Sequence, residues 1–347
     1  MAQEFRRILI VRTDRIGDVI LTLPMARALK ERYPDASIAM LIRQYTSELV
    51  SDHTAVDRML LYDENGQLHP FFHLVRLLRK EQFDIVFHTY PRFRLALMMW
   101  FAGIPVRVGT GYRWYSFLFN RRVYEHRKDA KRHELEYNLN LLSAIGYSVN
   151  SETLKPVLDV NSESLKYVKN VLVSNGIADN NRFVILHPGS GGSARDWSAK
   201  NFGLLAKRLS QLPEIKVVVT GSKNERELVE QVRSFAGDSV IPLVGLFNLK
   251  EYSALTKLSA VFVSNSTGPI HVAAATGTPI VGLYPQVTAL SAKRWGPYTE
   301  KKTVFTPLNK PSDCNKCVAG QQDICECMET ICVDDVYTAV VEQLGMK

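Results

Sequence analysis

The stretch VFVSNSTGPIHVAAATGTPIVGLY, residues 261–284, decides the fold of this chain. An apolar run at 261–263 leads into the polar turn NSTGP, a helix-like apolar run follows at 270–275, and a second apolar run begins at 280. This order predicts a strand, a loop, a helix and a second strand. Such a loop lies at the amino end of the helix, where backbone N–H groups and the helix dipole favour an anion. The turn taken alone is equally well explained as a helix cap by Ser266 or Thr267, with Pro269 in the first turn.

Composition indicates a soluble globular protein of about two domains. The chain has 347 residues, of which 46% are hydrophobic and 22% charged. No signal-peptide pattern opens it, and no apolar stretch reaches the ~18 residues needed to span a bilayer, so the cytoplasm is the expected location. Lys and Arg number 43 against 35 Asp and Glu, which favours an anionic partner: nucleic acid, a phosphorylated substrate or a membrane surface. The charge excess alone does not choose among the three.

Strand-like and helix-like runs alternate along both halves of the chain. The first half has strands at 7–12, 37–42, 59–62 and 84–88, with helices at 19–33, 71–80 and 95–101; the second has strands at 183–186 and 216–220, with helices at 201–212, 226–235 and 249–258. Alternation of this kind predicts α/β domains with doubly wound parallel sheets. We expect an N-terminal domain over 1–160, a second domain over 161–330, and a C-terminal helix in 331–347 that packs back on the first domain. A cleft between the two domains is the expected active site.

Two loops of the second half carry features of a phosphate site. HPGSGG, residues 187–192, follows a strand, and its glycines allow backbone N–H groups to approach phosphate oxygens; a flexible surface loop is the alternative. It is neither a Walker loop nor a dinucleotide fingerprint. Arg195 can add charge-assisted bonds to a diphosphate or be a solvated surface residue, and Glu225 can accept from ribose hydroxyls or complement a helix dipole. His271 lies one helical turn after Thr267 and either faces the same anion or belongs to the core.

In the first half, Asp14 and Asp18 lie in the turn after the first strand. One of them can act as a general base facing the cleft, while the other caps a helix. The chain contains no Asp-X-Asp pair, which argues against a metal-dependent nucleotide-sugar site of that type. The segment YRWYSFLFNRRV, residues 112–123, mixes aromatic side chains with Arg113 and other arginines. It is either a half-buried element with snorkelling arginines or a contact for an anionic acceptor or a membrane headgroup region.

Together these motifs resemble glycosyltransferase family 9, the bacterial heptosyltransferases that build the inner core of lipopolysaccharide. The likeness runs nearly from end to end. It is carried, in this order, by ILIVRTDRIGDVILTLPMARAL, FDIV, RVGTG, HPGSGGSARDWSAKNF, VVVTGSKNERE, LVGLFNLKEYSAL, SNSTGPIHVAAATGTPIVGLYP and CMETICVDDV. Each motif alone is weak, but the combination is specific.

The resemblance implies a GT-B architecture of two Rossmann-like domains and an inverting, metal-independent transfer that requires no cofactor. It implies ADP-heptose as donor, an anionic lipid-linked glycan as acceptor, and association with the inner face of the inner membrane. Asp18 in RIGD matches the general base, and we expect Asp14, Arg15 and Arg113 to contact the acceptor. The expected donor-binding residues are Ser190, Gly191, Arg195, Glu225, Ser266, Thr267, Gly268 and His271.

The sequence departs from the family pattern at two positions. Ser266 stands in the turn before Thr-Gly-Pro where many members have aspartate, and His88 ends the FDIVFH strand where aspartate is common. Both changes leave the donor and the acceptor open.

All five cysteines lie between residues 314 and 332, which fits a reducing compartment better than a disulfide framework. Four of them offer a structural zinc site, although the C-x-C spacing is unusual for one and reduced thiols are the alternative; they are Cys314, Cys317, Cys325 and Cys327.

Two other functions compete with sugar transfer. The first is a sugar-nucleotide or phosphoglycan-binding protein of the same fold without catalysis, for which Ser266 is the hint. The second is a nucleotide-sugar epimerase, against which the RIGD and STGPIH motifs argue. Nucleic-acid binding has only the basic charge in its favour and is not expected.

Overall fold

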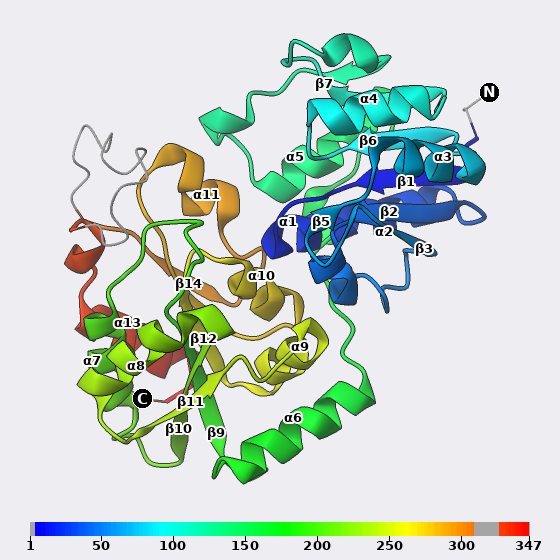
Figure 1. Cartoon of the computed structure of the whole chain (residues 1–347). Helices are drawn as coiled ribbons and strands as arrows, with labels where there is room; N and C mark the ends of the chain where they lie inside the picture. Colours follow the sequence, from blue (N-terminus) through cyan, green and yellow to red (C-terminus); the bar gives the residue numbers. More distant parts are fainter. Residues whose placement is uncertain (1–3, 309–325, 347) are drawn as a thin grey trace. The chain divides into compact units, whose positions relative to one another are not determined.

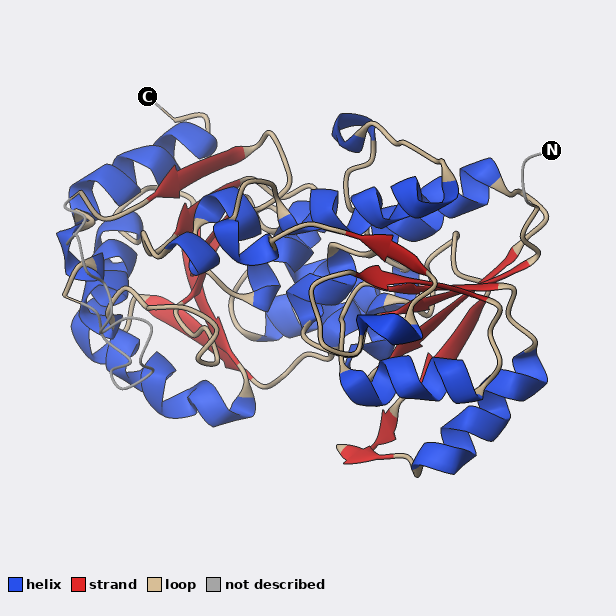
Figure 2. Cartoon of the chain, turned by 90° about the horizontal axis from the view of Figure 1, so that it is seen from above, coloured by secondary structure: helices blue, strands red, loops and turns tan. Residues whose placement is uncertain are grey.

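The computed structural model describes residues 4–308 and 326–346. Its chain divides into two compact units, Met1–Val157 and Leu158–Lys347, close to the expected boundary at residue 160. Each unit contains a six-stranded sheet in which every strand pairs parallel to its neighbours. Helices flank the strands in both units (Figures 1 and 2). None of the helices within the described ranges is long and apolar enough to cross a membrane.

The sheet of the first unit has the strand order β3-β2-β1-β6-β7-β8. Its strands are β1 (Arg7–Val11), β2 (Ser37–Ile42), β3 (Arg58–Leu61), β6 (Ile85–His88), β7 (Val106–Thr110) and β8 (Arg121–Val123), and a small hairpin joins β4 (Asp63–Glu64) to β5 (Gln67–Leu68). The helices are α1 (Ile16–Ile20), α2 (Leu23–Arg32), α3 (Phe71–Glu81), α4 (Phe93–Phe101) and α5 (Glu134–Asn140). Because β2 and β6 lie on opposite sides of β1, the chain reverses direction across the sheet at β1, where doubly wound sheets bind ligands.

The helix predicted over 19–33 is divided into α1 and α2. Pro24 lies at the start of α2, where its missing N–H and its ring are tolerated, but a continuous helix would place that ring against the carbonyl of Ile20. The break leaves Asp18 on the short α1, and the Thr22 hydroxyl donates to the Asp18 carbonyl oxygen at 2.8 Å. Asp14, in the loop after β1, and Asp18, on α1, therefore both lie close to the carboxyl end of β1.

The second unit repeats the arrangement with the order β11-β10-β9-β12-β13-β14. Its strands are β9 (Arg182–His187), β10 (Ile215–Gly221), β11 (Val240–Val244), β12 (Val261–Asn265), β13 (Ile280–Leu283) and β14 (Lys302–Phe305). Its helices are α6 (Ser162–Ser174), α7 (Ala199–Leu209), α8 (Arg226–Ala236), α9 (Leu249–Leu258), α10 (Gly268–Ala275), α11 (Ala292–Trp295) and α13 (Val333–Gln343). The reversal here lies between β9 and β12, so the loops after these two strands share one ligand-ready edge.

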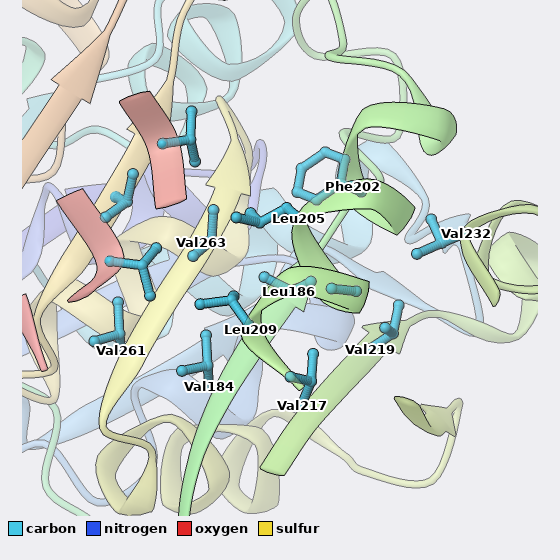
Figure 3. Close-up of a cluster of buried hydrophobic side chains, with 14 of the residues drawn as sticks. Val184, Leu186, Phe202, Leu205, Leu209, Val217, Val219, Val232, Val261 and Val263 are labelled. Carbon is cyan, nitrogen blue, oxygen red and sulfur yellow. The ribbon is translucent and has the colours of Figure 1, made fainter. Parts of the chain in front are cut away.

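One face of this sheet packs against α7, α8 and α13 in a continuous apolar core. Figure 3 shows part of this core, in which strand residues meet side chains of the helices; the labelled residues are Val184, Leu186, Val217, Val219, Val261, Val263, Phe202, Leu205, Leu209 and Val232. The buried face of α13 belongs to the same core through Val336 and Val340. This differs from the expectation that the final helix packs back on the first domain, because its apolar stripe is covered by the second unit.

Candidate functional site

In the first unit, a buried arginine gathers the two aspartates of the turn after β1. Arg12 follows the last residue of β1, and only 2% of its side chain is exposed. Its Nε donates to Asp14 Oδ1 at 2.7 Å, and its Nη2 donates to Asp18 Oδ1. The two carboxylates, each 13% exposed, are thereby held side by side at the carboxyl edge of the sheet.

Helix α5 supplies the remaining partners of Arg12. Nη1 of Arg12 lies 3.5 Å from Glu134 Oε1, and the same nitrogen donates to Asn138 Oδ1 at 3.3 Å. Arg127 also donates to the Glu134 carboxylate and to Asn138, which places two guanidinium groups and three carboxylates in one cluster. The Asn138 amide in turn donates to the carbonyl of Leu21 at 3.1 Å. This buried network of hydrogen bonds and ion pairs therefore holds the loop after β1 in place.

The charges of this cluster do not cancel. Burial would lower the pKa of Arg12, but the carboxylates of Asp14, Asp18 and Glu134 outweigh that effect and raise it, so the guanidinium keeps its charge. With three carboxylates and two cations in one place, one carboxyl group is favoured to hold a proton. That group is Asp14: burial, opposed by Arg12 and reinforced by the neighbouring Asp18, raises the pKa of Asp14 from 3.8 to about 7.

The two aspartates are therefore not equivalent. Near neutral pH, Asp14 carries a proton for part of the time and can then donate a hydrogen bond. Both aspartates accept from the Arg12 guanidinium through Oδ1, so they differ in this proton and not in their contact with the arginine. Of the other expected acceptor residues, Arg15 is exposed at the start of α1, and Arg113 is exposed in the loop that follows β7. That loop lies at the same carboxyl edge of the sheet as Asp18.

In the second unit, the two predicted phosphate loops are joined by buried polar side chains. Asn265, the fully buried last residue of β12, donates to the Pro188 carbonyl at 2.7 Å and accepts from the Trp197 N–H at 2.9 Å. The Ser193 hydroxyl lies 2.6 Å from the Ser190 carbonyl oxygen and 3.1 Å from that of Ser266, so it can donate to either loop. Hydrogen bonds thus connect the loop after β9 to the loop after β12.

The predicted anion site lies at the amino end of α10. Thr267 is the residue before the helix, it is extended, and its side chain makes no capping hydrogen bond. The cap that the sequence allowed for Thr267 is therefore absent, and the first N–H groups of α10 have no acceptor from this side chain. Gly268 begins the helix, and Pro269 has no N–H to satisfy. His271 is buried one turn further along the same helix.

The loop after β9 is built around Ser190 and two glycines. The Ser190 hydroxyl donates to Asp196 Oδ2 at 3.1 Å, and only 6% of the residue is exposed. Gly191 and Gly192 both have positive φ, +55° and +71°, which side chains rarely allow, and a Cβ on either would meet nothing within 4 Å. Arg195, expected to meet phosphate, is 7% exposed in the same loop.

Glu225 lies directly over this loop. A Cβ on Gly189 would approach Glu225 Oε1 to 1.9 Å, so the glycine is required for the carboxylate to occupy its place. The other oxygen, Oε2, accepts from the Ser222 N–H at 2.7 Å in a capping box at the start of the 3-10 helix Lys223–Glu225, which leads into α8. Both interpretations of Glu225 are thus compatible with one position: one oxygen caps a helix while the other points to the glycine loop.

The two positions that depart from the family pattern have local explanations. The side chain of Ser266 is 9% exposed and hydrogen-bonds the hydroxyl of Tyr284, which also donates to the Trp295 carbonyl at 3.0 Å. His88 is buried against Phe119, and neither of its ring nitrogens has a hydrogen-bond partner among the described residues. Burial, together with the charge of Arg107, lowers the pKa of His88 to about 3, so this imidazole is neutral.

Most of the cysteine cluster lies outside the described residues: Cys314, Cys317 and Cys325 belong to residues 309–325. Cys327 is partly buried and Cys332 is exposed. Within 4–308 and 326–346, no three His, Cys, Asp or Glu side chains gather as ligands of one metal ion would. The zinc site therefore stays a prediction.

Sequence reasoning missed the buried residues that organise both loops. Arg12 was visible as a charge that interrupts the apolar run 8–11, and a charged residue at the end of a buried strand needs a partner. Asn265 was visible as a polar residue ending the strand at 261–265, but its two partners lie in another loop and could not be identified. Glu134 and Asn138 carried no signal, since their spacing fits any helix.

Comparison with known proteins places the chain in one family. Its residues 71–324 match the sequence profile of glycosyltransferase family 9 (heptosyltransferase). Lipopolysaccharide heptosyltransferase 2 of Salmonella typhimurium is 27% identical over 292 residues, which cover 80% of this chain and 82% of that protein.

Two solved structures share the fold over nearly the whole chain. A family 9 glycosyltransferase of Veillonella parvula superposes with a TM-score of 0.83 at 22% identity, covering 99% of this chain and 98% of that one. The ADP-heptose lipopolysaccharide heptosyltransferase II of E. coli gives 0.78 at 23% identity, with 97% and 98% covered. The two doubly wound units are thus a GT-B fold, and the chain belongs to glycosyltransferase family 9, the heptosyltransferases.

Proposed function

We propose that this glycosyltransferase moves heptose from ADP-heptose to a sugar hydroxyl of the lipopolysaccharide core, with inversion and without a catalytic metal ion. The observation that carries the proposal is the pair Asp14 and Asp18 on Arg12, at the edge of a doubly wound sheet. A carboxylate that is oriented by a buried guanidinium and still 13% exposed suits a general base.

The acceptor hydroxyl gives its proton to Asp18 as its oxygen attacks the anomeric carbon of the donor. The new carbon–oxygen bond forms on the face opposite the diphosphate, the bond to the diphosphate oxygen breaks, and ADP leaves with that electron pair. A single displacement of this kind inverts the configuration at the anomeric carbon. Arg12 fixes Asp18 in place, and Asp14 in its protonated form can donate to the acceptor.

The second unit offers groups that stabilise the departing diphosphate. The uncapped N–H groups of α10 and the glycine loop at 189–192 provide donors for phosphate oxygens. Glu225 Oε1 can accept from a ribose hydroxyl while Oε2 keeps its helix cap. The absence of an Asp-X-Asp pair from the sequence supports catalysis by these groups rather than by a metal ion held in such a motif.

ADP-heptose and the lipopolysaccharide core are supported by the names of two relatives: the E. coli structure is an ADP-heptose lipopolysaccharide heptosyltransferase, and the Salmonella protein is a lipopolysaccharide heptosyltransferase. Ser266 does not argue against that donor, since its hydroxyl is engaged by Tyr284.

A panel of nucleotide sugars tests the donor by thermal shift. A donor at ~100 times its dissociation constant stabilises the folded chain by about 2.7 kcal/mol, so ADP-heptose should raise Tm more than UDP- or GDP-sugars at equal concentration. The preferred donor is then incubated with a heptose-deficient core oligosaccharide in the presence of EDTA, and the anomeric configuration of the product is read by NMR. A retained configuration, or a strict need for a divalent ion, would contradict the proposed mechanism.

A further inference from the structure

The first unit exposes large aromatic side chains along one side of α4. Phe93, Trp100 and Phe101 are 39%, 49% and 39% exposed, and their spacing of seven and eight residues puts them on one side of the helix. An aromatic side chain extends this row at each end. Trp114 is 72% exposed in the loop after β7, and its ring lies 4.7 Å from that of Phe93; Phe72 of α3 is 70% exposed, and its ring lies 6.3 Å from that of Phe101.

Phe117, at 64% exposure, lies in the short 3-10 helix Ser116–Leu118 that follows Trp114. Figure 1 shows α4 and this loop together at one edge of the first unit. We call this surface the aromatic face; it consists of Phe72, Phe93, Trp100, Phe101, Trp114 and Phe117. Soluble chains rarely expose so many large apolar side chains together unless the surface binds something.

The surroundings of the aromatic face are strongly basic. Residues 69–124, which contain it, hold nine arginines and lysines but two acidic residues. Both acidic side chains are engaged at other places: Glu81 pairs with Arg58, and Asp84 accepts from the backbone N–H groups of Arg6 and Arg7. This one segment therefore carries most of the excess positive charge of the chain.

The basic side chains lie at both ends of the aromatic face. Arg76 follows Phe72 by one turn of α3 and is exposed, and Arg79 donates to the Phe101 carbonyl at 2.7 Å. At the other end, Arg113 precedes Trp114, and the edge strand β8 begins with the exposed Arg121. An apolar surface flanked by arginines complements a layer that has anionic headgroups above apolar chains.

We propose that the aromatic face docks the protein on an anionic membrane surface, with the aromatic rings at the headgroup level and the arginines on lipid phosphates. Trp and Tyr favour this depth because one end of the ring is apolar and the other is polar. A second copy of the chain is a less suitable occupant, because two such faces would bring like charges together.

The aromatic face continues toward the candidate base. The Arg12 guanidinium lies 6.0 Å from the centre of the Tyr90 ring, and Arg92 lies over the same ring at 4.6 Å. Arg92 precedes Phe93, the first residue of the aromatic row on α4. A lipid-linked acceptor that stays in the membrane would therefore need to reach only past Tyr90 to bring its sugar to Asp18. This second step rests on the proposed function, whereas the docking itself does not.

Vesicle binding by the full chain tests the docking without donor or acceptor. We expect co-sedimentation with vesicles of phosphatidylcholine and phosphatidylglycerol that is much stronger than with phosphatidylcholine alone and falls with salt. Each arginine near the vesicle surface raises the binding constant about fivefold, so R76Q/R121Q should weaken vesicle binding by about 25-fold. W114S/F117S should weaken it by at least about tenfold, also at low salt, since the loss there is apolar area.

Matched controls lie in the second unit. K166Q/K257Q removes two exposed charges and Y167S removes a 44% exposed aromatic ring, and neither should change vesicle binding by more than about twofold. Equal binding by the wild type to neutral and anionic vesicles would overturn the proposal, as would equal losses in the face and control variants. So would a wild-type dimer that W114S/F117S dissociates, since the face would then be an interface between copies. Activity on a soluble acceptor tests the proposed function separately.

Discussion

Replacing Arg12 by methionine should strongly destabilise the first unit while leaving the second unchanged. The guanidinium is 2% exposed and makes charge-assisted hydrogen bonds to Asp14 and Asp18, each worth about 1.5–3 kcal/mol. Its loss also leaves Glu134 with Arg127 as its remaining cation in the cluster. Two effects reduce this loss of stability: the methionine side chain fills part of the volume of Arg12, and the carboxyl groups can take up protons. We therefore expect a loss of about 3–5 kcal/mol, as for other buried ion pairs that lose one partner.

Because a chain of two compact units need not unfold in a single step, amide hydrogen exchange is the suitable assay. Peptides that cover β1 report the opening free energy of the first unit, and peptides that cover β9 report that of the second. The loss in R12M should shrink as pH falls from 8 to 5, because protonation removes the charges that the methionine leaves without a partner.

Arg58→Met is the control, because Arg58 makes an ion pair with Glu81 in the same unit but is 55% exposed. It should cost no more than about 1 kcal/mol. An R12M loss as small as that of R58M, or one that does not depend on pH, would refute the view that Arg12 holds the two aspartates by charge.

One further substitution tests the loop after β1, and another tests the loop after β9. Since the pKa of Asp14 is raised from 3.8 to about 7, the folded chain binds this proton more tightly than the unfolded chain does. The free energy of unfolding of the wild type should therefore fall as pH rises between those values. In D14N this contribution to the pH dependence should vanish, as measured by denaturant titrations at several pH values. Gly189→Ala should displace the Glu225 carboxylate, and because the end of that side chain is flexible, Tm should change little. Donor binding should weaken by about tenfold or more. Calorimetry measures the donor affinity of G189A and, for comparison, of E225Q. Unchanged affinity in both variants would remove Glu225 from the donor site.

Much of the fold could be predicted because both sheets are parallel and covered on two faces, so their inner strands are nearly continuous apolar runs. The strands at 37–42 and 280–283 and the helix at 249–258 have the predicted bounds. The elements that escaped prediction are less apolar or irregular. β11 contains Pro242, which a strand tolerates at the edge of a sheet, and β14 is a short strand at the opposite edge. The helix α6 was not predicted either.

The loops of the candidate site could be predicted, because strand ends and glycines mark them in the sequence. Asp18, Ser190 and Thr267 lie where the alternation of strands and helices placed them. What orients them was not predictable, because Arg12 meets Glu134 and Asn138 across more than a hundred residues of sequence. A single sequence shows that such a buried charge needs partners but not which residues provide them.

The central claim is that Asp18 removes the proton from the acceptor, and the pair D18N and D14N tests it most directly. Both substitutions keep the side-chain shape on the same arginine. We predict that D18N lowers kcat for transfer by ~100-fold or more with donor affinity unchanged, as expected for loss of a general base, while D14N loses less than about tenfold. Wild-type-like turnover of D18N, or a larger loss in D14N than in D18N, would contradict the account.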